Sequence, residues 1–323
     1  MAERIEYIDS AKGLCMLLIV ASHVGIADPW PGAYSVRVIL FFVLSGYFFS
    51  AKLNIKEFFR KKTKTLLVPF LFWWVLSYVL FYLGQALIPN FSDMTSAKGI
   101  FDCFTQKEYF NGPLWFLLAL FFLQAICYFV ERYIPSSIYK CTVYTLIGIV
   151  GCKLAFYEID LPLNIDVAFS ATPFFVMGML LRRYSIIEHF EKNSVVAISI
   201  VVLYSLYLFC PVAIFMSVNR FGNSFPEVYG IGAALSMAYI LLTKLASEYL
   251  PMVSKILAYV GYNSLIVMCA HHLLYRPFKM LLVRYSFGDF DGLILLVVSI
   301  GVSLLLVSVI ERYCPFIIGK EKK

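Results

Sequence analysis

The sequence is poor in charged residues and in the short motifs that mark many soluble enzymes. Only 15% of its 323 residues are Asp, Glu, Lys or Arg, whereas a typical soluble domain has about 25%. It has no Walker loop, no G-x-G-x-x-G or H-E-x-x-H motif, and no internal repeat. These absences leave the P-loop, dinucleotide-binding, zinc-protease and repeat classes without support.

Cysteine pairs and a cleavable leader are also missing from the sequence. The eight cysteines form no C-x-x-C motif and most lie in apolar stretches, so we expect small buried hydrophobic residues rather than disulfides or a metal site. The first apolar segment begins near Ile8, contains Lys12 and lacks a small-residue cleavage site. It is therefore predicted to be an uncleaved signal anchor.

The sequence is instead rich in hydrophobic residues, at 61%, and its mean hydropathy is +0.81. These values predict an all-α, polytopic integral membrane protein, because each membrane-spanning helix needs about 20 apolar residues. Ten spans are predicted, at residues 8–27, 34–52, 66–88, 113–131, 141–157, 167–182, 195–215, 228–246, 256–275 and 291–311. No long polar segment separates them, so we expect residues 1–323 to form a single membrane domain.

The positions of Lys and Arg predict the orientation of the chain. The net charge is +7, but the positive residues gather in short loops such as "KLNIKEFFRKKTK" after the second predicted span. This pattern is typical of cytoplasmic loops and does not favour nucleic-acid binding. With that loop inside, both termini are predicted to be cytoplasmic. The basic outer loop "YRPFKMLLVRYSFGDFD" departs from the pattern, so we expect it to form an interfacial or re-entrant helix.

Lys12 and His23 stand at the two ends of the first apolar segment, "KGLCMLLIVASH". Eleven helical residues make three turns plus roughly 20°, so both side chains face the same way, about 16 Å apart along the axis. His23 either bonds a neighbouring carbonyl or water, or acts as a general base, since imidazole titrates near neutral pH. Lys12 is either a snorkelling residue at the membrane boundary or a cation for a phosphate group arriving from the cytoplasm.

The second predicted span carries Arg37 just before "VILFFVLSGYFF", near the expected level of His23. An arginine at the outer end opposes the usual charge bias, which favours a contact to an oxyanion or a substrate. Ser45 and Gly46 lie in the middle of the span. They are predicted to be small residues that let helices approach closely, with a nucleophilic Ser45 as the alternative.

Three later residues are candidate substrate contacts. Asn111 and Trp115 occur in "NGPLWFLLALF" and would hydrogen-bond and stack on a sugar, although an interfacial tryptophan is also a common membrane anchor. His271, two turns after Asn263 in the ninth predicted span, is a proton acceptor, a donor-substrate contact or a polar residue that joins helices. Its neighbour His272 is expected to point about 100° away on the helix.

Five motifs, in order along nearly the whole chain, resemble those of membrane acyltransferase family 3, the bacterial O-acyltransferases that modify surface sugars. They are "RIEYIDSAKGLCMLLIVASH", "RVILFFVLSGYFF", "RKKTKTLLVPF", "GPLWFLLALF" and "NSLIVMCAHHLL". Lys12 and His23 match the basic residue and the histidine of the first motif, and that basic residue is often arginine in the family. Arg37 matches the arginine of the second motif. The fourth motif is similar to the tryptophan motif of the sugar O-acetylase branch, and His271 is the better match in the last.

The resemblance implies a multi-pass O-acetyltransferase of the inner cell membrane. It would move an acetyl group from cytoplasmic acetyl-CoA to a hydroxyl of a glycan or lipid-linked sugar, with acetyl-CoA as a substrate and no bound cofactor. Lys12 would hold the donor, His23 would deprotonate the acceptor, and Arg37 would stabilise the oxyanion. Direct transfer and an acyl-enzyme on His23 or Ser45 are both compatible with the residues.

Two other classes fit a multispan chain with charged groups in its spans. A transporter or flippase of a lipid-linked sugar would be expected to show paired broken helices and inverted repeats, and the sequence suggests neither. A membrane sensor without chemistry would not need a histidine and an arginine inside the membrane. The sequence predicts neither an oligomeric state nor the identity of the acceptor sugar.

Overall fold

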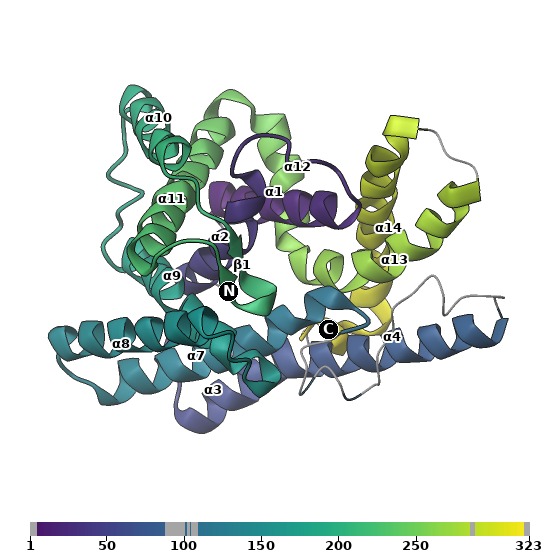
Figure 1. Ribbon diagram of the computed structural model, residues 1–323, viewed down its shortest axis with the longest axis horizontal. Coiled ribbons are helices and arrows are strands. Elements are labelled where there is room, and N and C mark those ends of the chain that lie inside the picture. The colour runs from purple at the N-terminus through teal and green to yellow at the C-terminus, as the bar shows by residue number, and fades with distance from the viewer. Residues whose placement is uncertain (1–4, 88–100, 102–103, 105–108, 285–287, 320–323) are drawn as a thin grey trace.

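The computed structural model describes residues 5–87, 101, 104, 109–284 and 288–319 (Figure 1). Within these residues the chain is almost entirely helical, and its one sheet pairs two short strands, β1 (Ile214–Phe215) and β2 (Arg220–Phe221). The predicted all-α fold is therefore confirmed for the described part of the chain.

The helices follow the predicted apolar segments, and each of the ten predicted ranges overlaps at least one of them. Their bounds are α1 Glu6–His23, α2 Ala33–Tyr47, α3 Ile55–Lys62, α4 Val68–Leu87, α7 Trp115–Tyr133, α8 Ser137–Phe156, α9 Ile165–Arg183, α10 Asn193–Phe209, α11 Phe225–Tyr249, α12 Pro251–Tyr262, α13 Ser264–Arg284 and α14 Asp291–Tyr313. A π-helical turn at Thr63–Leu67 joins α3 to α4, and a 3-10 turn at Gly112–Leu114 leads into α7.

The count of ten membrane spans and the cytoplasmic position of the termini are not confirmed. In the described residues, six segments are long and apolar enough to cross a membrane, or seven if the bent pair α12–α13 is one span. Helices α2 and α10 have 15 and 17 residues, and the 18 residues of α1 include Glu6, Asp9 and Lys12. In Figure 1, α4, α7 and α8 run across the view while α14 runs up it, so the helices do not share one axis.

The ninth predicted span, 256–275, is broken rather than continuous. Helices α12 and α13 meet at Asn263 with a bend of 78°. The Asn263 amide donates to the Tyr259 carbonyl at 2.9 Å, and such local bonds compete with the regular helical pattern. The residues at the break, "GYNS", include glycine, asparagine and serine, which favour a turn.

The basic segment "YRPFKMLLVRYSFGDFD", expected to form an interfacial or re-entrant helix, is helical over most of its described residues. Helix α13 continues through Pro277 to Arg284, and a short 3-10 turn follows at Gly288–Phe290. Residues 285–287 of this segment lie outside the described residues. The position of this segment at the membrane surface stays a prediction, and the bent pair α12–α13 at Asn263 is a further candidate for a re-entrant segment.

Glycines bring α1 against α12 and α2 against α9. A Cβ built at Gly46 would lie 1.9 Å from the Phe175 carbonyl oxygen, and one built at Gly261 would lie 1.9 Å from the Asp9 carbonyl oxygen. No side chain fits at such distances, so the helix backbones are in direct contact. This agrees with the prediction that the small residues in the second apolar segment permit close helix approach.

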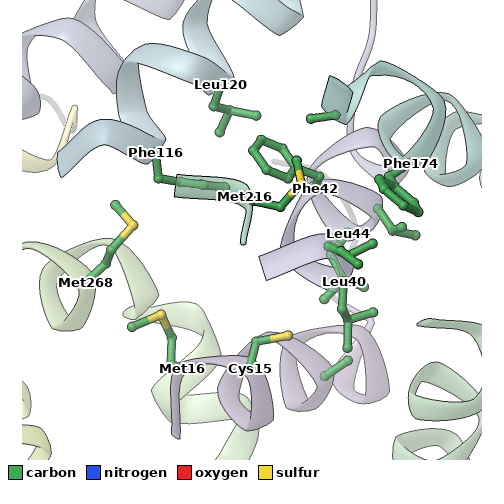
Figure 2. Packing of buried hydrophobic residues seen from close by; sticks show 14 of the residues in the cluster. Cys15, Met16, Leu40, Phe42, Leu44, Phe116, Leu120, Phe174, Met216 and Met268 are labelled. Atoms are coloured by element: carbon green, nitrogen blue, oxygen red, sulfur yellow. The ribbon is translucent and has the colours of Figure 1, made fainter. Parts of the chain in front are cut away.

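The core lies where α1, α2, α7 and α9 meet. Figure 2 shows buried side chains of α1, α2 and α7 turned toward one another, and the rings of Phe42 and Phe116 have centroids 4.8 Å apart. Because Trp115 and Phe116 are the first residues of α7, this packing holds the start of α7 beside α2. The core thereby positions the N-terminal end of α7 at the candidate site described below.

Replacing Gly261 with alanine is expected to lower the free energy of unfolding by about 1–3 kcal/mol or more, because the added methyl group forces α12 away from α1. The matched control is Gly301→Ala in α14, where a Cβ meets no atom within 4 Å. Thermal unfolding of both variants in one detergent checks this expectation. Equal midpoints for the two variants would contradict the close packing of α1 and α12.

Candidate active site

The first two helices run antiparallel and place two pairs of residues opposite each other. At one end, His23 and Arg37 line the same cavity, whose volume is about 110 Å³. At the other end, the Lys12 ammonium lies 4.2 Å from the centroid of the Phe48 ring. Eleven residues separate the two ends on each segment, which corresponds to about 16 Å along a helix. Lys12 and His23 are therefore far apart, and Arg37 shares the end of His23.

His23 is the last residue of α1, and its side chain is exposed to the cavity. The helix ends there because Gly25, two residues later, has a φ of +88°, a conformation that favours glycine and stops helices. Within the described chain, the His23 ring makes no hydrogen bond to another residue. An imidazole nitrogen is thus free to accept a proton from a bound hydroxyl group.

Both histidines of α13 lie beside His23. The centroid of the His23 ring is 5.4 Å from that of His271 and 5.1 Å from that of His272. His271 is fully buried, and its Nδ1 donates to the Val267 carbonyl at 2.8 Å. In a neutral ring this bond leaves Nε2 unprotonated, and Nε2 has no partner among the described residues. Two imidazoles of the cluster, the exposed His23 and the buried His271, therefore have an Nε2 that makes no hydrogen bond to a described residue.

His272 was not predicted to take part, because it was expected to point away from His271. The two rings do diverge, with centroids 5.8 Å apart and planes at 78°, and the His23 ring contacts both. The Gly112 backbone N–H donates to His272 Nδ1 at 3.3 Å, and the Tyr275 hydroxyl lies 3.3 Å from Nε2. The adjacent pair of histidines in the sequence could have indicated a cluster. Two side chains that diverge by about 100° on a helix leave space for a third ring between them.

Asn111 and Trp115, the predicted sugar contacts, are separated by the structure. Trp115 lines the cavity with His23 and Arg37. Asn111 is buried outside it, and its amide donates to the Cys269 carbonyl at 2.8 Å and to the Ser77 hydroxyl at 3.2 Å. These bonds tie the 3-10 turn to α13 and so hold the Gly112 N–H at His272. Asn111 is therefore placed to position the histidine cluster and not to touch a ligand in the cavity.

Two arginines belong to the surroundings of the histidine cluster. Arg37 donates to the carbonyl of Tyr34, whose ring centroid is 4.9 Å from the guanidinium carbon. Arg276, which sequence reasoning missed, lies one turn after His272 with its guanidinium carbon 4.5 Å from the centroid of the Phe110 ring. Its buried Nη1 has no partner in the described part of the chain. An arginine four residues after the histidine pair is a signal that could have identified it.

Lys12 and Ser45 do not line the cavity, and both have partners of their own. The Lys12 ammonium forms an ion pair with Asp9 at 3.2 Å. The Ser45 hydroxyl donates to the Phe41 carbonyl of the preceding turn at 2.8 Å. Ser45 is thus engaged with its own helix, as small polar residues in membrane helices commonly are.

The cysteines are unpaired in the described residues. Cys15, Cys127 and Cys269 are buried, as expected for small hydrophobic residues, whereas Cys141 is exposed. Across the same residues, no group of three His, Cys, Asp or Glu side chains is arranged to hold a metal ion.

Comparison with known proteins places this architecture in a family. A family model described as an acyltransferase domain matches residues 5–312, which include both helices that carry the clustered histidines. No curated protein and no solved structure gives a significant match. The match spans nearly the whole chain, and several helices are apolar enough to cross a membrane. The chain therefore belongs to acyltransferase family 3 and is a multi-pass membrane acyltransferase.

Proposed function

We propose that the protein is an O-acetyltransferase of the inner cell membrane, which moves an acetyl group from acetyl-CoA to a hydroxyl of a glycan or lipid-linked sugar. One observation carries the proposal: His23, exposed and free of hydrogen bonds to described residues, shares a cavity with the guanidinium of Arg37. Acyl transfer needs a base for the attacking hydroxyl and a cation for the oxyanion, and these two side chains are of those kinds.

In the proposed reaction, His23 alone carries the proton from the acceptor hydroxyl to the leaving thiolate. His23 removes the proton of the acceptor hydroxyl, and the hydroxyl oxygen attacks the thioester carbonyl carbon. The negative charge on the carbonyl oxygen of the tetrahedral intermediate is stabilised by Arg37. The carbon–sulfur bond then breaks, and the CoA thiolate takes the proton from His23. The engagement of Ser45 with its own helix supports this direct transfer over an acyl-enzyme on Ser45.

The cavity supports a sugar as the acceptor. Trp115 and Phe41 lie in its wall next to His23, and aromatic faces of this kind stack on the apolar face of a sugar ring. A volume of about 110 Å³ is several times the roughly 10–15 Å³ that one water molecule needs on the same measure. We expect this cavity to hold one edge of the sugar and the acetyl end of the donor.

The proposed function is tested by the O-acetyl content of surface glycans, measured by NMR. A strain that lacks the protein is complemented with the wild type or with His23→Ala at equal membrane levels. Acetyl groups restored by the wild type alone are expected. Unchanged acetyl content in the uncomplemented strain would overturn the proposed glycan acceptor, and binding of acetyl-CoA to the purified protein would then separate an acyltransferase from a lipid-linked sugar transporter.

Lys12→Ala is expected to raise the KM for acetyl-CoA with little change in kcat, because a cation that binds the donor uniformly affects the ground and transition states alike. Lys12→Arg keeps the charge and is expected to be tolerated. Steady-state kinetics with varied acetyl-CoA measures both effects. An unchanged donor KM in Lys12→Ala would assign the ammonium to its ion pair with Asp9 alone.

A further inference from the structure

A second cavity, of about 630 Å³, lies where the C-terminal ends of α2, α7 and α9 meet. Its wall contains four cationic side chains, Lys52, Arg132, Arg182 and Arg183, and one acidic side chain, Glu131. None of the site residues predicted from the sequence lies in it. The cavity is thus a separate feature of the fold with a strong excess of positive charge.

The acidic residue does not neutralise this excess. Glu131 forms ion pairs at 2.9 Å with Arg183 and at 2.9 Å with Lys140, which lies outside the cavity. Arg182 donates to the Tyr47 hydroxyl at 3.2 Å, and that hydroxyl donates onward to Glu188 at 3.1 Å. These bonds hold Arg182 and Arg183 in place, while Lys52 and Arg132 are exposed. A concave wall with an excess of positive charge concentrates its field on the space inside, which favours a ligand with several negative charges.

The ordinary reason for basic residues at a helix end is the orientation of the chain in the membrane. Orientation in the membrane does not explain why cations from separate segments should line a single cavity. Here Lys52 follows α2, Arg132 lies in the last turn of α7, and Arg182 and Arg183 lie in the last turn of α9, yet all of them line one space. The arrangement therefore has the character of a binding site, because guanidinium and ammonium groups converge on a common centre.

The basic cavity lies at the Lys12 end of the molecule. Tyr47 and Phe49 line it, and Phe48 between them contacts the Lys12 ammonium. From Tyr47 back to Arg37 is ten residues of helix, about 15 Å. A ligand whose charged part occupied this cavity would need a long, flexible arm to reach the cavity of His23 and Arg37.

We propose that the basic cavity binds the phosphate groups of the nucleotide half of the acyl-CoA donor. This proposal rests on the proposed function, since it extends the donor from the reacting acetyl group to its other end. The nucleotide half carries a diphosphate and a 3′-phosphate, which suit four cations, and the pantetheine arm accounts for the distance to His23. An anionic lipid headgroup has the same phosphate chemistry, but it usually presents a single phosphate.

The test is binding of adenosine 3′,5′-bisphosphate, a fragment with no acyl group, to the purified full-length protein in neutral detergent. Isothermal titration calorimetry compares the wild type with Lys52→Gln/Arg132→Gln. These two residues are exposed and form none of the ion pairs described for the cavity. Affinity is expected to fall by about tenfold or more, because two charge-assisted contacts are lost. Lys255→Gln, at an exposed residue of α12 outside the cavity, is the matched control and is expected to bind like the wild type.

Equal affinity in the double variant and the wild type would overturn the proposal. Displacement of the bisphosphate by phosphatidylglycerol at fixed ionic strength, with no displacement by phosphatidylcholine, would assign the cavity to lipid headgroups and would also overturn it. The binding assay needs no acceptor, so its outcome is independent of the glycan experiment. If the double variant loses affinity while surface acetylation proves absent, the phosphate site stands and the proposed acceptor is wrong.

Discussion

His23→Ala is expected to lower the rate of acetyl transfer by at least about 10²- to 10⁴-fold, the usual effect of removing a general base. The ring is the exposed member of the histidine cluster, and His271 and His272 are buried behind it. Neither buried imidazole can take its place at the acceptor hydroxyl without a movement of α13. The loss is therefore expected in kcat, with a small change in the KM for acetyl-CoA.

The measurement is transfer of radiolabelled acetyl groups from acetyl-CoA in membranes that contain equal amounts of each variant. His189→Ala is the matched control, because His189 is exposed and bonds the Ser185 carbonyl away from the cluster. It is expected to retain wild-type activity. A His23→Ala variant with more than about a tenth of the wild-type kcat would be inconsistent with general-base catalysis by this residue.

Arg37→Ala is expected to reduce kcat by about 10²- to 10³-fold, the effect seen when one oxyanion contact is removed. Arg37→Lys keeps the charge but loses the planar guanidinium, so we expect partial activity. The control is Arg312→Ala, at an exposed arginine of α14 outside the cavity. Steady-state kinetics with varied acetyl-CoA and with varied acceptor separates this effect on kcat from an effect on binding.

Arg276 makes the Arg37 experiment more informative. It lies one helical turn after His272, and its buried Nη1 has no partner in the described residues. If Arg37→Ala left kcat unchanged while Arg276→Ala lowered it, the oxyanion contact would belong to α13 and the role proposed for Arg37 would be wrong. Equal wild-type activity in both variants would exclude an arginine contact to the oxyanion altogether.

The helices were predictable from the sequence because long apolar stretches leave the backbone few alternatives to helix inside a membrane. The approach of Arg37 to His23 is consistent with two antiparallel helices joined by the short connection at residues 24–32. The break at Asn263 falls in "GYNS", whose turn-forming residues were a usable signal, but long apolar stretches on both sides favoured the prediction of one continuous span. The count of ten spans stays a prediction, because α2 and α10, with 15 and 17 residues, are apolar but shorter than the usual length of a span.

The candidate site was predictable in part, for a different physical reason. A charged or imidazole group in an apolar stretch is conspicuous, so His23, Arg37 and His271 could be selected without any structure. Whether such a group faces a cavity depends on partners far along the chain. Asn111 was selected as a ligand contact, yet it bonds the Cys269 carbonyl and Ser77. Arg276 was passed over because the basic segment around it was interpreted as an interfacial or re-entrant helix.

The histidine cluster joins the first helix of the chain to one of the last, and this arrangement has a consequence for biosynthesis. When the ribosome has made the first half of the protein, α1 and α2 are already present with His23 and Arg37, but α13 has not been translated. A nascent or truncated chain therefore holds a base and a cation without the wall that His271 and His272 supply. We expect such a chain to be unable to hydrolyse or misdirect acetyl-CoA, so that activity begins only after α13 has been translated and docked beside α1.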